Sequence, residues 1–131
     1  MKGMKMKATS NIILCLFLAV CLLTAVGCGK KADENKPISE VKTEAETMST
    51  DDLRAAAISY KEAITAKNEE VEKIAAKLKD IPVAEMLGEE AKGLKADMEN
   101  LKNSVSALQE RFSIYYDKLK EKGADLSGLE I

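Results

Sequence analysis

The sequence predicts an all-α protein built around a long antiparallel helical hairpin with coiled-coil heptads. Three observations support this fold class. Two long stretches carry apolar residues at alternating steps of four and three, the pattern of a helix that packs along one seam. A proline separates the two stretches, and a helix-start signature precedes the first. The hairpin is expected over residues 49–122.

The first helix is predicted over about residues 50–79. Ser49 is placed to cap it, Asp52 completes a capping box, and Met48 and Leu53 form the flanking apolar pair. Lys67 is the only polar member of the seam: it can fix the register of the pairing, or its stem can pack while the ammonium group reaches solvent. The whole seam consists of Leu53, Ala57, Tyr60, Ile64, Lys67, Val71, Ile74, Leu78 and Ile81.

A turn is predicted near residues 80–82. Pro82 disfavours a helical conformation at Ile81 and suits the first turn of a new helix, and the apolar pattern changes phase at this point. A second helix is therefore expected over about residues 82–122, antiparallel to the first because the turn is short. One continuous rod with a proline kink is the alternative. The second seam consists of Leu87, Ala91, Leu94, Met98, Leu101, Val105, Leu108, Phe112, Tyr115 and Leu119.

Pairing the two arms about this turn brings Phe112, Tyr115 and Tyr116 near the start of the first helix. These aromatic residues are expected to be ordinary core, with Tyr116 the best candidate for exposure. Additional apolar positions widen both stripes, and a lone pair of helices leaves much of each seam half exposed. The hairpin is therefore expected to pair with a second copy as a four-helix bundle, or to dock on a partner protein.

The first 27 residues have the plan of a secretory signal peptide. Lys2, Lys5 and Lys7 form a basic start, and an uncharged apolar stretch follows. The alternative is an uncleaved transmembrane anchor. The apolar run from Ile12 to Val26 is 15 residues long, however, whereas a spanning helix needs about 20.

The end of this segment, Ala25-Val26-Gly27-Cys28, resembles the signal-peptide motif of bacterial lipoproteins. The resemblance covers residues 1–28 only. It implies cleavage before Cys28, a diacylglycerol on the Cys28 sulfur, and often a further acyl chain on the new amino group. Cys15 and Cys21 leave with the signal peptide, so the mature chain cannot form an internal disulfide. The resemblance also implies that the protein lies in the bacterial cell envelope, lipid-anchored on the outer side of the cytoplasmic membrane or at the outer membrane.

The segments that flank the hairpin are predicted to carry little structure. Residues 28–48 begin with a charged, non-periodic stretch and are interpreted as a lipid-attached flexible tether. Within this segment, residues 38–48 carry a weak helical pattern. Residues 123–131 are expected to form a loose tail after Gly123, which is placed to end the second helix.

Composition excludes several classes of function. The sequence has no histidine, and its mature part keeps one cysteine, which removes the usual zinc sites and histidine-dependent catalysis. Removal of residues 1–27 leaves 17 basic and 22 acidic residues, a poor charge balance for binding nucleic acid. We therefore expect no enzyme activity, no cofactor, no metal, no nucleic acid and no small-molecule substrate.

The sequence accordingly predicts a non-catalytic lipoprotein that acts as a helical spacer, scaffold or protein-interaction module. Its expected contacts are the membrane, through lipidated Cys28, and either a second copy or another envelope protein. The alternative is a surface-exposed adhesin or ligand-binding lipoprotein on the same anchor. Heptad hairpins serve many roles, so the fold does not choose between them.

Overall fold

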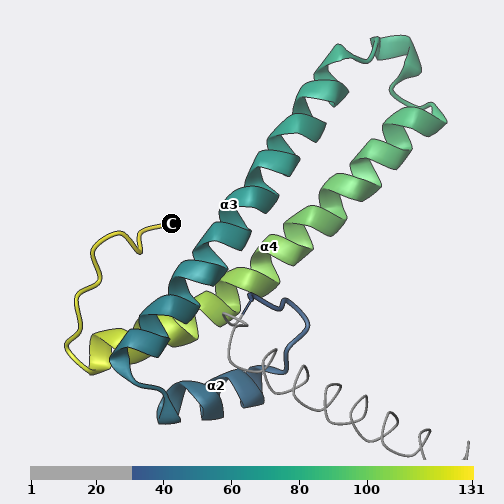
Figure 1. The fold of residues 1–131 in the computed structure, drawn as a ribbon. Helices are drawn as coiled ribbons and strands as arrows, with labels where there is room; N and C mark the ends of the chain where they lie inside the picture. The colour runs from purple at the N-terminus through teal and green to yellow at the C-terminus, as the bar shows by residue number, and fades with distance from the viewer. Residues whose placement is uncertain (1–30) are drawn as a thin grey trace, which may run out of the picture.

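The computed structural model describes residues 31–131, and the predicted signal peptide (1–27) and Cys28 lie outside this range. Two long helices, α3 (Thr50–Asp80) and α4 (Glu89–Glu121), run side by side and are joined at one end, so the predicted helical hairpin is confirmed (Figure 1). A shorter helix, α2 (Ile38–Thr47), packs against α4 at the open end. We call the open end the base and the joined end the tip.

The start of α3 follows its sequence signature. The Ser49 hydroxyl accepts a hydrogen bond from the backbone N–H of Asp52 at 3.2 Å and donates one to the Asp52 carboxylate at 2.7 Å. This arrangement satisfies one of the free N–H groups in the first helical turn. Met48 and Leu53 on either side of the cap are both buried.

The tip differs from the prediction because α4 begins at Glu89, not near residue 82. Pro82 is followed by a short 3-10 helix, Val83–Glu85, in which the Glu85 N–H donates to the Pro82 carbonyl at 2.8 Å. The Gly88 N–H then donates to the Glu85 carbonyl at 2.8 Å. Leu87, which the heptad pattern places in the seam, belongs to this connection and is 83% exposed.

The prediction that residues 38–48 belong to a flexible tether is wrong. Residues 38–47 form α2, and Met48 caps its C-terminal end. Val41 and Ala45 of this helix are completely buried. The weak apolar periodicity of this stretch therefore marks a real helix. The helix is short, and its contact with α4 supplies the burial that an isolated helix of this length lacks.

The expected loose tail, residues 123–131, is also ordered and runs back beside α3 (Figure 1). Gly123 has a φ of 66°, the left-handed conformation that ends helices readily when no Cβ is present. Arg54 of α3 then donates to the carbonyls of Asp125 and Ser127 at 2.5 and 2.6 Å. Leu129 is 1% exposed and joins the core, and Ala124 and Leu126 pack against it, so these apolar contacts and the side chains of α3 hold the tail.

The core is concentrated in the base half of the hairpin. The buried cluster includes Ile64 on α3 and Val105 on α4, and continues from these residues to the base. Beyond them, the seam is half buried except at Ala91, which is completely buried near the start of α4, although the heptad spacing continues. The half-buried seam residues of this distal half are Val71, Ile74, Leu78, Leu94, Met98 and Leu101. The difference follows from coverage, because α2 and the tail lie against the base half only.

Candidate functional site

The segment that precedes α2 is fixed across the two long helices, and we call residues 31–37 the strap. The backbone N–H of Ala32 donates to the Ser59 hydroxyl at 3.1 Å. The Tyr60 hydroxyl accepts from the N–H of Asp33 at 3.2 Å and donates to its carbonyl at 3.1 Å. Two neighbouring side chains of α3 thus satisfy three backbone groups of the strap.

Arg111 attaches the strap to α4. Its guanidinium group donates from Nε and Nη2 to the Lys36 carbonyl, at 2.9 and 2.6 Å, and from Nη1 to the Ala107 carbonyl at 2.7 Å. The side chain is 8% exposed. A buried guanidinium group is costly unless its donors are used, and here three of the five are hydrogen-bonded to carbonyls.

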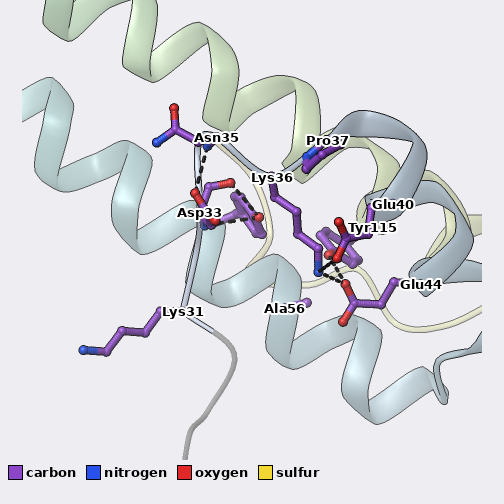
Figure 2. A pocket seen from close by; sticks show the side chains of 10 residues that line it. Lys31, Asp33, Asn35, Lys36, Pro37, Glu40, Glu44, Ala56 and Tyr115 are labelled. Atoms are coloured by element: carbon purple, nitrogen blue, oxygen red, sulfur yellow. Dashed lines mark hydrogen bonds and ion pairs between the residues drawn. The ribbon is translucent and has the colours of Figure 1, made fainter.

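A polar cluster closes the space between the strap and α2. The Lys36 ammonium group pairs with the Glu44 carboxylate and lies 3.9 Å from that of Glu40. The Tyr115 hydroxyl lies 3.5 Å from the same Glu44 oxygen, and Figure 2 shows these side chains pointing toward one another. The hydrogen bond to Glu44 raises the pKa of Lys36. Burial, followed by the charge of Glu44, raises the pKa of Tyr115.

The cluster borders a cavity of about 440 Å³ lined by residues of the strap, α2, α3 and α4. Tyr60 and Tyr115 both line it, and the centroids of their rings lie 5.5 Å apart. The polar side chains around it join the strap and α2 to each other and to α4, so their contacts have a structural role. Within residues 31–131, no group of three or more cysteine, aspartate or glutamate side chains could hold a metal ion.

A second hollow lies between the helices in the distal half, and we call it the distal groove. Its volume is about 370 Å³. It is lined by Lys67, Glu70 and Ile74 of α3 and by Asp97, Asn100, Leu101 and Ser104 of α4. Beyond it, the tip exposes two large apolar side chains, Val83 at 91% and Leu87 at 83%. Two such exposed apolar side chains within one short segment make the tip a candidate contact surface.

The residues singled out from the sequence fall into three groups. Cys28 lies outside the described residues. Phe112 and Tyr115 are buried in the core, as expected, and Tyr116 is half buried with its ring 5.7 Å from that of Phe112. Lys67 is half buried and makes no hydrogen bond or ion pair within the described range, so no polar contact there fixes the register through it.

Sequence reasoning did not find the strap or the residues that hold it. Arg111 sits directly beside the seam residue Phe112, and a long cation at such a flanking position is the one signal that could have been noticed. No described helix is long and apolar enough to cross a membrane. A comparison of the chain with protein-family models, with curated proteins and with solved structures finds no match.

Proposed function

We propose that this protein is a lipid-anchored, non-catalytic module of the bacterial cell envelope whose hairpin contacts other protein surfaces as a spacer or scaffold. The observation that carries the proposal is the unequal burial of the two seams along the length of the hairpin. The base half buries its apolar residues against α2 and the tail, whereas the distal half leaves the same pattern half exposed.

The exposed distal surface is organised before any partner arrives. The backbone of the tip is held by the hydrogen bonds of its 3-10 turn, and the Lys95 ammonium group donates to the Met86 carbonyl at 3.3 Å. Val83 and Leu87 project from this fixed backbone. A surface that is already ordered loses little conformational entropy on binding, which favours association.

The anchor in this proposal rests on the lipoprotein-like motif that ends at Cys28. Two or more acyl chains are needed for firm attachment, because each buried CH₂ contributes only about 0.8 kcal/mol. The mass of the mature N-terminus tests this part. We expect a chain that begins at Cys28 and carries diacylglycerol. An unmodified chain that begins at Met1 would refute the anchor.

A photo-crosslinking amino acid tests the contact surface in cells that express the full chain. We expect Leu87 replaced by the crosslinker to give a protein adduct of defined mass. The matched control carries the same crosslinker at Ser113, which is exposed on the base half of α4, and should give none. Adducts at neither position, or equally at both, would contradict a distal contact surface.

A further inference from the structure

We propose that the distal groove is filled by the distal half of α3 from a second copy of this chain, in antiparallel orientation. The inference rests on the proposed function in one respect, that the distal half is the contact surface. It adds the identity of the partner and the direction of the pairing. Three features of the described residues support it.

The first feature is that the groove lies next to a part of the hairpin that the strap already covers. On the base side of Lys67, a cavity of about 290 Å³ is lined by Ala32, Asp33 and Glu34 of the strap together with Ala63 and Leu108 of the hairpin. Lys67 lines both this cavity and the distal groove. The strap therefore lies along the hairpin up to Lys67, and beyond that residue the same side has no cover from the described chain.

The second feature is the charge pattern along one edge of α3, where Glu70 and Ile74 line the groove and Lys77 lies beyond its lining. Glu70, Ile74 and Lys77 are spaced at steps of four and three, so they share one face of the helix. Glu70 and Lys77 are exposed and form no ion pair within the described part of the chain. Their charges are opposite, and two helical turns separate them.

This spacing is self-complementary in one direction only. If a second copy of α3 runs antiparallel with the two-fold axis beside Ile74, each Glu70 faces the Lys77 of the other chain, and both contacts form at once. A parallel pair would place Glu70 opposite Glu70 and Lys77 opposite Lys77. The other charged groups of the groove, Lys67 and Asp97, are also of opposite sign, which suits a partner of balanced charge.

The third feature limits how far two chains can overlap. At the base, the strap and α2 cover one side of the hairpin, and the tail hydrogen-bonds to Arg54 and Lys61 on α3. In the distal halves, the described chain provides no such cover. The four-helix arrangement predicted from the sequence would then be confined to the distal halves, with the two bases at opposite ends of the assembly.

Charge reversal tests the pairing and its direction. The mature full chain, purified in detergent, is followed by sedimentation equilibrium over a range of protein-to-detergent ratios. Glu70→Lys and Lys77→Glu should each weaken the dimer by about tenfold, because each change turns two attractive contacts into repulsive ones. The double variant, Glu70→Lys with Lys77→Glu, should return to within about twofold of the original. Circular dichroism should show equal helix content throughout.

Glu62→Lys is the matched control, since Glu62 is an exposed acid on the base half of α3. This variant should leave the dimer unchanged. A wild-type chain that stays monomeric would overturn the proposal, and so would a double variant as weak as either single one. A monomer that still gives the Leu87 adduct with a different protein would refute the second copy while leaving the proposed function intact.

Discussion

Loss of the Arg111 side chain should release the strap without unfolding the hairpin. Arg111→Met keeps most of the aliphatic bulk and removes the guanidinium group, which makes two hydrogen bonds to the Lys36 carbonyl and one to the Ala107 carbonyl. The Ala107 contact lies within α4. Arg111 therefore holds the strap only through the two hydrogen bonds, from Nε and Nη2, to the Lys36 carbonyl.

The size of the effect follows from this contact. A hydrogen bond from a charged donor contributes about 1.5–3 kcal/mol, and the two bonds share one acceptor, so we take about 2 kcal/mol for the fork. That free energy corresponds to a change of about thirtyfold in the opening equilibrium of the strap. The backbone N–H groups of Ala32 and Asp33 report the opening, because they donate to Ser59 and Tyr60 only while the strap is in place.

Amide hydrogen exchange measured by NMR checks the prediction. In Arg111→Met, the amides of Ala32 and Asp33 should exchange about thirtyfold faster, while amides in the middle of α4 keep their protection. Arg111→Lys is the matched comparison, because it retains the charge but not the planar fork, and its effect should be intermediate. Unchanged exchange at Ala32 and Asp33 in a normally helical Arg111→Met protein would show that Tyr60 and Ser59 alone hold the strap.

Three further predictions concern the stability of the fold, each measured as the free energy of unfolding in urea. Gly88→Ala should destabilise by about 1 kcal/mol, because a Cβ there would lie 3.0 Å from a backbone oxygen of the tip turn and alanine is a poor N-cap. Gly93→Ala, in open space within α4, should instead stabilise by about 0.5–1 kcal/mol; equal effects would contradict the tip geometry. Ile64→Ala should cost about 2–4 kcal/mol and Ile74→Ala about 1 kcal/mol, since the first is buried and the second half buried, and equal losses would argue against an open distal half. The raised pKa of Tyr115 makes its stabilising contribution complete below its ordinary pKa of 10.0 and progressively lost above it. Tyr115→Phe should therefore lose less stability than the original chain between about pH 9 and about pH 11, and an identical loss would refute the role of this phenol.

The hairpin was predictable because its signals are periodic and local. The capping box at Ser49 and the heptad seams depend on side chains at fixed spacings, and they led to the correct fold class. The start of α4 was misplaced because Pro82 suits the first turn of an α-helix and of a 3-10 helix equally well. Leu87 then continued the heptad spacing by chance, in a segment that is not helical.

The strap and the tail were not predictable from the sequence for a different reason. Arg111 and Arg54 donate to backbone carbonyls. Every residue has a backbone carbonyl, so the sequence does not show which residue accepts the hydrogen bond. The tail packs on the core through Leu129, which is buried, and through Ala124 and Leu126, which are partly buried. These residues are too few to form a periodic pattern that the sequence would reveal. These contacts arise only once the hairpin has brought distant segments together.

The strap also sets how far the molecule can stand from a lipid surface. If residues 28–48 were a flexible chain, their root-mean-square end-to-end distance would be about 25 Å, and the hairpin could move over that distance from Cys28. With Ala32 fixed to Ser59, only residues 29–31 lie between this attachment point and Cys28, and the four Cα–Cα steps can span at most about 14 Å. Ser59 is not at the base: it lies nine residues from the start of α3 and 21 from its end, or about 14 Å and about 32 Å along the helix axis. A lipid-anchored chain would thus be attached by its side, and its tip would meet only surfaces within about 45 Å of the membrane.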